Sequence, residues 1–331
     1  MNNKIDFVIT WVDGNDPEWQ KERAQFSNFS GDNRSVRFRD WDNLQYLFRG
    51  IEKFTPWVNK VYFVTWGHTP SWLNENNPKL KIVKHTEFIP QRYLPTFNSH
   101  TIELNLHRIQ GLSDRFVYFN DDTFITGHMK ETDFFKKGLP CDSGVLSPVI
   151  GNFRGSISSI IINNMEIINS NFTKNEVLKN NLGKWFNPLY KKDNINTFLL
   201  LPWKKFVGFK NPHLPVSYLK ETFNHLWEQE HELLDDTCEF KFRNKQNINH
   251  WLMRYWQLVN GTFTPRDTNI GYCYSLTNKN EKVFNAIKNQ KYKLTCVNDN
   301  DSDPISNFNL EKDLLKKAFH NILPEKSSFE M

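Results

Sequence analysis

Short apolar runs recur at intervals along the first third of the chain. Runs of this kind stand at residues 5–10, 61–65, 80–83 and 116–119, and each has the length and apolar character of a buried strand. Amphipathic patterns lie between them. Strands that alternate with helices form a mostly parallel sheet covered on both faces, so the pattern predicts an α/β fold.

Two helices are predicted within this alternating region. The first is capped by Asp42 and has apolar residues at positions 44, 47, 48 and 51. The second has apolar residues at positions 102, 106 and 109 and precedes the fourth strand. Both helices therefore present one apolar face to the predicted sheet.

The pattern changes after Gly127. Residues 130–215 have weak periodicity, residues 217–259 are predicted to be helical, and a final helix covers residues 310–322. We expect this last helix to dock on the protein, with membrane-surface association as the alternative. The chain is thus predicted to form one domain over residues 1–300, with a less regular insertion around 130–210 and a helical C-terminal tail at 301–331.

Composition and charge narrow the class of protein. Aromatic residues make up 15% of the chain, which supplies a large core. The net charge of +5 is spread without a Lys/Arg block, so we expect no nucleic-acid partner, whereas a mild positive excess suits a pyrophosphate substrate or an anionic surface. No run is long enough for a membrane span, and Asp6 interrupts the first.

Four widely spaced cysteines complete this picture. None forms a C-x-x-C pair and no secretory signal is apparent, so we expect reduced thiols and a cytoplasmic location, or one at the inner face of the membrane. The sequence predicts no oligomeric state.

The clearest candidate for chemistry is the Asn-Asp-Asp segment that ends the fourth predicted strand. Carboxylates such as Asp121 and Asp122, at the C-terminal end of a strand, suit Mg²⁺ or Mn²⁺, which take oxygen ligands and substrate phosphates. A solvated turn is the alternative, and the local pattern does not decide between the two.

Two segments near the N-terminus are candidates for binding phosphate. Asp13 and Gly14 follow the first strand, where a turn suits a nucleotide, although an ordinary loop has the same residues. Arg37 and Arg39 precede Asp40, and their spacing directs both to one side of an extended segment as a fork for phosphate oxygens. A surface strand with two arginines is the alternative.

The second predicted helix carries a polar stripe of His100, Glu103 and His107. It begins after Asn98 and Ser99, which suit a helix cap. The stripe either faces an active site or metal, or forms a hydrogen-bonded structural face. Because this helix should start near the C-terminal ends of the strands, we expect Ser99, His100 and Glu103 to lie nearer the active end than His107.

Three further positions lie in the second half. His213 stands between two prolines, and a stiff loop histidine suits a general acid or base, with a structural role as the alternative. Arg243 and the Asn298-Asp299 pair are weaker candidates by composition alone.

Together these segments resemble the Stealth family of sugar-phosphate transferases. The family includes bacterial capsule hexose-1-phosphate transferases and the lysosomal-enzyme N-acetylglucosamine-1-phosphotransferase. Its four blocks occur in order: IDFVITWVDGNDP at residues 5–17, a long block over residues 37–127, a third that includes His213 and EFKFRNKQNINHWLMRYWQLVNG, and TCVND at residues 295–299. The first two blocks are highly specific, the third is looser and the fourth is short.

The resemblance implies a Rossmann-like core similar to that of nucleotide-sugar transferases, with a helical C-terminal portion. The family's catalytic residues fall on Asp121, Asp122, His213 and Arg243, and its divalent metal, Mg²⁺ or Mn²⁺, on Asp121, Asp122 and Asp299. The substrate-binding candidates are Asp13, Gly14, Arg37, Arg39, Asp40, Asn98, Ser99, His100, Glu103 and Asn298. One departure, Trp66-Gly67-His68 in place of a common Asn-Gly-Gln, lies near the expected substrate cleft.

The reaction that the resemblance implies is phosphotransfer. A hexose-1-phosphate, or an N-acetylhexosamine-1-phosphate, would pass from a UDP-sugar to a hydroxyl of a glycan or lipid-linked glycan, with release of UMP, in capsule or cell-surface polysaccharide synthesis. Two alternatives stay open: metal-dependent glycosyl transfer that releases UDP, and glycan binding without catalysis. The leaving nucleotide distinguishes phosphotransfer, which releases UMP, from glycosyl transfer, which releases UDP.

Overall fold

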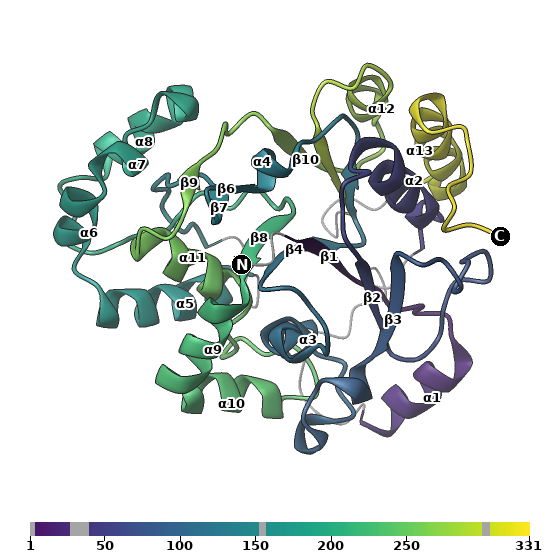
Figure 1. Cartoon of the computed structure of the whole chain (residues 1–331), viewed down its shortest axis with the longest axis horizontal. Coiled ribbons are helices and arrows are strands. Elements are labelled where there is room, and N and C mark those ends of the chain that lie inside the picture. The colour runs from purple at the N-terminus through teal and green to yellow at the C-terminus, as the bar shows by residue number, and fades with distance from the viewer. Residues whose placement is uncertain (1–3, 27–39, 152–156, 300–304) are drawn as a thin grey trace.

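A five-stranded sheet forms the centre of the computed structural model, which describes residues 4–26, 40–151, 157–299 and 305–331 (Figure 1). Its strand order is β3-β2-β1-β4-β8. The four predicted strands are confirmed as a parallel set: β1 (Ile5–Thr10), β2 (Val61–Thr65), β3 (Leu80–Lys84) and β4 (Arg115–Asn120). The predicted mostly parallel α/β fold is therefore correct.

The fifth strand, β8 (Val216–Leu219), pairs with β4 in the antiparallel direction. The prediction of helix from residue 217 is thus wrong at its start. Four residues are too few to show a two-residue period of their own, and their apolar positions merge with those of α9 (Lys220–Gln229). The helical pattern then continues as α10 (His231–Glu239) and α11 (Trp251–Val259).

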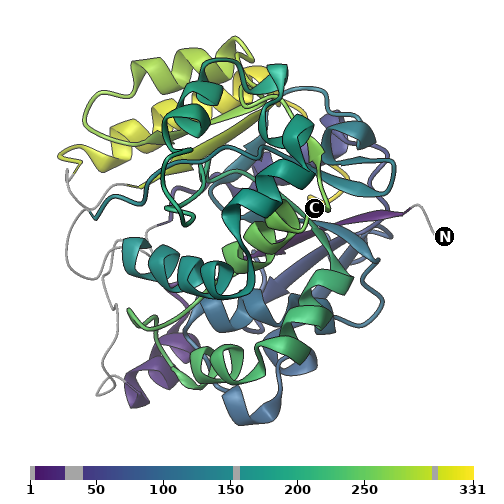
Figure 2. The same cartoon turned by 90° about the vertical axis from the view of Figure 1, so that its left-hand side faces the viewer.

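Helices cover both faces of this sheet, and each face has its own apolar core. Helices α2 (Leu44–Phe54), α12 (Glu281–Lys288) and α13 (Phe308–Ile322) share one core. Helices α5 (Ile157–Asn171), α9 and α11 belong to the other. Figures 1 and 2 show α12 and α13 on the opposite side of the sheet from α9 and α10.

The predicted terminal helix is confirmed as α13, and it is docked. Its buried Leu315 and Phe319 belong to the first core, and Phe319 stacks on Tyr46 of α2. The segment after it is also held, because Arg49 of α2 forms an ion pair with Glu330 at 2.7 Å. Within the described ranges, no helix combines the length and apolar character needed to cross a bilayer.

Two details of the predicted helices are wrong. The N-cap of α2 is Asn43, because Asp42 has a φ of 49° and its carboxylate pairs with Lys316 of α13. The second predicted helix is shorter than expected: α3 (Ser99–Leu104) ends before Asn105, and the chain continues as a single 3-10 turn. The side chain of Asn105 donates to the carbonyl of Thr101, which competes with continuation of the helix.

A second sheet contacts the end of β4. It contains β10 (Gly271–Ser275), β11 (Leu294–Asn298) and β5 (Thr123–Ile125) in that order. Strands β10 and β11 are parallel, and β5 runs antiparallel to β11. Only two residues, Asp121 and Asp122, separate β4 from β5, so the acidic pair joins the two sheets.

The remaining elements are a third sheet and several short helices. A small third sheet is formed by β6 (Phe135–Lys136), β7 (Leu139–Asp142) and β9 (Thr264–Pro265). Residues 130–210 also contain the helices α4 (Glu131–Phe134), α6 (Lys174–Asn180), α7 (Leu182–Trp185) and α8 (Asn194–Leu199). Helix α1 (Pro17–Gln25) follows the loop after β1 and is capped by Asp16.

Close packing of α2 on β5 supports the acidic pair, and it yields a stability prediction. A Cβ at Gly50 would lie 2.5 Å from the carbonyl oxygen of Ile125. We expect Gly50→Ala to lower the free energy of unfolding by about 1–3 kcal/mol, as overpacking does. Gly183→Ala in α7 is the control, because nothing lies within 4 Å of its Cβ. Equal losses in the two variants, measured by denaturant unfolding, would contradict the prediction.

Candidate active site

Several of the predicted site residues meet at one edge of the central sheet. Asp13 follows β1, Asp121 and Asp122 follow β4, and these strands are parallel, so their C-terminal ends coincide. His213 precedes β8, whose antiparallel direction places its beginning at the same edge. Open parallel sheets bind ligands at this edge.

Asp122 and His213 form the central pair of the site. Their Oδ2 and Nε2 atoms are 3.2 Å apart. The pairing of Tyr118 with Val216 brings the residues that follow β4 close to those that precede β8. His213 has a φ of 49°, in the left-handed region that few residues other than glycine adopt, and such conformations cluster at functional sites.

Charge sets the protonation state of His213. Burial disfavours the imidazolium, but the charge of Asp122 and its hydrogen bond outweigh burial and raise the pKa of His213 to about 9. While this pairing lasts, His213 is a cation at neutral pH. It becomes a proton acceptor only when the influence of Asp122 is weakened.

The acidic pair has the properties of a site for a hard divalent cation. The side chain of Asp121 is exposed yet set among many protein atoms, so desolvation, and then the charge of Asp122, raises the pKa of Asp121 to about 7. The Oδ1 atom of Asp122 is buried and has no hydrogen-bond partner among the described residues. Adjacent carboxylates with an unused oxygen suit Mg²⁺ or Mn²⁺.

The end of β11, in the second sheet, lies next to this acidic pair. The backbone N–H of Val297 donates to the carbonyl of Asp122 at 2.9 Å, so Asn298 and Asp299 lie beside the acidic pair. The indole N–H of Trp41 donates to Oδ2 of Asp299 at 3.2 Å. Asn298 is exposed and so is Asp40, while Arg37 and Arg39 lie outside the described residues.

Arg243 approaches from the loop between α10 and α11. Its Nε and Nη2 atoms donate to Oγ of Ser99 at 2.9 and 2.6 Å. From there its positive charge acts on Asp121, on Glu103 and on His213. Arg243 and Ser99 therefore belong to the electrostatic surroundings of the acidic pair.

Asn98 holds the start of α3 in place through its side-chain hydrogen bonds. Its Oδ1 accepts from the backbone N–H of His100, and its Nδ2 donates to three oxygens, including Oδ1 of Asn247 at 3.1 Å. It is fully buried. Asn98 thus fixes the start of α3 under Ser99, and its hydrogen-bonding groups are already in use.

The polar stripe of α3 does not face one site. Glu103 lies near Arg243, and the ring of His100 approaches Oδ1 of Asn247 at 3.4 Å. His107 lies elsewhere: it packs against Phe223 with ring centroids 5.6 Å apart, and burial lowers its pKa to about 3. Ser99 and Glu103 therefore lie near Arg243, whereas His107 lies in the core.

His250 is a site neighbour that the sequence analysis missed. Its Nε2 lies 4.0 Å from Oε2 of Glu103, and its Nδ1 is 2.7 Å from the hydroxyl of Tyr218. Burial lowers the pKa of His250 to about 3, so it is neutral beside the carboxyl. The pattern gave no signal for it, because nothing in the local spacing links this position to Glu103 or Tyr218.

Two thiols adjoin the pair and were also missed. Sγ of Cys296 lies 3.6 Å from Oδ2 of Asp122, and Sγ of Cys273 lies 3.0 Å from Sγ of Cys296. The sequence carried a signal for the first: the two-residue period of a strand places Cys296 on the same face as Asn298.

The loop after β1 forms one wall of the site. The backbone N–H of Asp13 donates to Nε2 of His68 at 2.8 Å, and Oδ1 of Asp13 accepts from the backbone N–H of Asn15. The rings of Trp11 and Trp66 lie 5.3 and 5.6 Å from the ring of His68. Gly14 lies within this turn, which the side chain of Asp13 stabilises.

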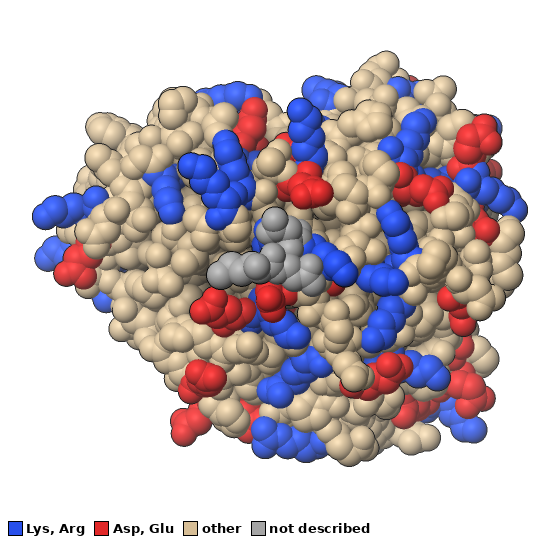
Figure 3. Space-filling view, in the orientation of Figure 1, with Lys and Arg blue, Asp and Glu red and all other residues tan. Residues whose placement is uncertain are grey.

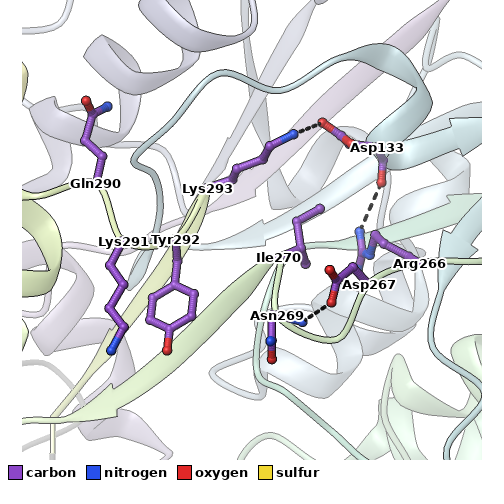
Figure 4. A pocket seen from close by; sticks show the side chains of 9 residues that line it. All are labelled: Asp133, Arg266, Asp267, Asn269, Ile270, Gln290, Lys291, Tyr292 and Lys293. Atoms are coloured by element: carbon purple, nitrogen blue, oxygen red, sulfur yellow. Dashed lines mark hydrogen bonds and ion pairs between the residues drawn. The ribbon is translucent and has the colours of Figure 1, made fainter. Parts of the chain in front are cut away.

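A polar cavity of about 290 Å³ lies elsewhere, at the other end of β10 and β11 (Figure 4). Its lining includes Arg266, Tyr292 and Lys293, with Lys293 paired to Asp133 at 2.8 Å. None of the predicted site residues lines it, so we do not place the chemistry there. On the face seen in Figure 3, basic and acidic side chains are interspersed.

The chain matches known proteins over nearly its whole length. The model described as Stealth protein CR1, conserved region 1, matches residues 3–30, and that for conserved region 2 matches residues 37–141. Capsular polysaccharide phosphotransferase WcwK of Streptococcus pneumoniae is 47% identical over 99% of this chain and 98% of its own length. Exopolysaccharide phosphotransferase cps2G of Lactiplantibacillus plantarum is 39% identical over 98% and 96%.

Among solved structures, the bifunctional glycosyltransferase WbbM aligns with 98% of this chain and 50% of its own. The TM-score is 0.43 and the identity 11%. A likeness at this level carries no argument about the site.

The surroundings of Glu103 predict a pH-dependent stability. Burial, against the opposing charge of Arg243, raises its pKa from 4.5 to about 7. The folded state therefore binds the extra proton more tightly than the unfolded state, and stability is lost as pH rises from about 4.5 through 7. We expect Glu103→Gln to stabilise the protein at pH 8 by up to about 3 kcal/mol, and to have little effect at pH 4.5.

Thermal unfolding of this variant across that pH range checks the prediction. Glu221→Gln, at an exposed position in the first turn of α9, is the control and should show no such trend. A Glu103→Gln effect that is the same at both pH values would mean that the carboxyl has the same pKa in the folded and the unfolded protein.

Proposed function

Because the chain belongs to the Stealth family of sugar-phosphate transferases, we propose that it transfers a hexose-1-phosphate from a UDP-sugar to a glycan hydroxyl and releases UMP. The observation that carries this proposal is the contact between Asp122 and His213 at the C-terminal edge of β4. It unites an acidic pair suited to a diphosphate donor with a group suited to take a proton. The relatives named above as phosphotransferases support transfer of phosphate rather than of the sugar alone.

The proposed reaction is a displacement at phosphorus. The acceptor hydroxyl attacks the phosphorus that bears the sugar, and a new oxygen–phosphorus bond forms. The bond from that phosphorus to the bridging oxygen of the diphosphate breaks, and UMP leaves with the electron pair. The hydroxyl proton passes to Nε2 of His213, and a phosphodiester joins the two sugars.

The proton transfer requires His213 to be neutral. The pKa of about 9 belongs to the pairing with Asp122, so the imidazole is neutral, and able to accept a proton, only when that carboxylate is engaged elsewhere. Asp121, Asp122 and Asp299 would hold a divalent cation, Mg²⁺ or Mn²⁺, whose charge offsets that of the diphosphate. In this proposal, binding of the cation by Asp122 also frees His213 to accept a proton, so the histidine acts as a base only when the site is loaded.

Other groups position the donor. Arg243, held by Ser99, supplies positive charge for the phosphoryl oxygens. The rings of Trp11 and Trp66, at the ends of β1 and β2, offer flat surfaces for the base of the nucleotide. The acceptor in this proposal is a glycan or lipid-linked glycan, and we place the reaction in the cytoplasm or at the inner face of the membrane.

Product analysis tests the reaction type. With a panel of UDP-sugars, a glycan acceptor and Mg²⁺ or Mn²⁺, we expect phosphorus NMR to show UMP and a new phosphodiester in equal amounts. Exhaustive chelation should abolish turnover, and the added ion should restore it. Release of UDP with no phosphodiester would establish glycosyl transfer instead.

The role of His213 is tested by substitution. His213→Ala should lower kcat by about two to four orders of magnitude while the KM for the donor changes little, because the imidazole acts on the acceptor proton. His320→Ala, at an exposed position near the end of α13, is the matched control and should keep full activity. If His213→Ala unfolds at a much lower temperature with its rate preserved, the residue is structural.

A further inference from the structure

We propose that Cys296, Cys273, His213 and Asp122 form a binding site for one thiophilic divalent cation, such as Zn²⁺, at the centre of the active site. This goes beyond the proposed function, because the transfer reaction uses neither thiol and its Mg²⁺ or Mn²⁺ would be held by carboxylates. The two thiols, the imidazole and the carboxylate come from four separate segments of the chain.

Three of the donor atoms already have the separations of a coordination shell. Oδ2 of Asp122, Nε2 of His213 and Sγ of Cys296 all lie within 4.8 Å of one another. Nε2 is 3.2 Å and Sγ 3.6 Å from Oδ2. A tetrahedral zinc ion with bonds of about 2.0–2.3 Å holds its ligands about 3.3–3.8 Å apart.

Cys273 supplies the fourth corner. It pairs in register with Cys296 on the neighbouring parallel strand, and the two Sγ atoms are 3.0 Å apart. A zinc-bound thiolate pair is separated by about 3.8 Å, so the side chain of Cys273, which lies outside the group of three, must turn toward the other ligands when the ion binds. Because β10 and β11 fix both backbones, the thiols are held together before any ion arrives.

The donor set selects the class of metal. Two sulfurs, one imidazole nitrogen and one carboxylate oxygen are ligands of Zn²⁺ and of its heavier analogue Cd²⁺, whereas Mg²⁺ prefers oxygen alone. An ion bound here occupies both Asp122 and His213. It therefore removes the proton acceptor and one carboxylate from the transfer site, so the ion inhibits; this consequence rests on the proposed function, but the binding does not.

A Cd²⁺ titration of the full-length, reduced chain in excess Mg²⁺ tests the site. We expect a thiolate-to-cadmium charge-transfer band in the ultraviolet that saturates at one ion per chain. Cys296→Ser should bind Cd²⁺ ~10-fold or more weakly and, like any variant with one thiolate, should give about half of the absorbance once saturated. Cys273→Ser should keep about half of the absorbance, in line with one thiolate instead of two.

Controls separate the site from other thiols. Cys141 is also buried but contacts the carbonyl of Thr132, so Cys141→Ser should give the wild-type band. His213→Gln keeps both thiols and should lower the affinity for Cd²⁺ about 10-fold, which tests the site even if a cysteine variant fails to fold. Wild-type binding by Cys296→Ser or by His213→Gln would overturn the proposal, and so would the absence of a band.

Activity measured in parallel keeps the two proposals apart. Zn²⁺ should inhibit sugar-phosphate transfer by the wild type and by Cys141→Ser, with much weaker inhibition of Cys273→Ser. A one-to-one band in a chain that shows no transfer would refute the proposed function and leave the metal site standing. Transfer that Zn²⁺ inhibits equally in the wild type and Cys273→Ser, with no charge-transfer band, would refute the metal site alone.

Discussion

The antiparallel hydrogen bonding of β8 to β4 is the constraint on which the site depends. A fifth parallel strand would present its C-terminal end at the edge that holds Asp122, and the residues before it would lie at the opposite edge. Reversal of this one strand instead brings His213 to within 3.2 Å of the carboxylate. The second sheet follows the same logic, because β11 runs antiparallel to β5 and so delivers Cys296 and Asp299 to the same place.

The site accumulates groups that a purely structural core would avoid. Asp121 and Glu103 both have pKa values raised to about 7, chiefly by loss of hydration, and one buried oxygen of Asp122 has no hydrogen-bond partner among the described residues. Each is unfavourable in the folded protein without a ligand. A bound cation or substrate would reduce the unfavourable free energy at Asp121 and at the buried oxygen of Asp122. Occupation of the site should therefore stabilise the folded protein.

Local pattern predicted the parallel strands well because each is a compact apolar run bounded by polar residues, as β2 and β4 illustrate. It failed for β8, whose four residues merge with α9, and for the cap of α2, where Asp42 instead pairs with Lys316 of a distant helix. The acidic pair was visible because it ends a strand. The neighbours His250 and Cys273 were not, because their positions depend on contacts between segments far apart in sequence, which no local spacing encodes.

The length of the segment between Asn120 and Thr123 is constrained by the strands on either side. Strand β4 is fixed at one end of it by β1 and β8, and β5 at the other by β11, with only two residues between. An insertion or deletion of one residue here would turn the side chains of β5 to the opposite face and withdraw Phe124 from its core. The length of this dipeptide therefore determines the relative register of the two sheets, so a change of one residue here would be felt in both.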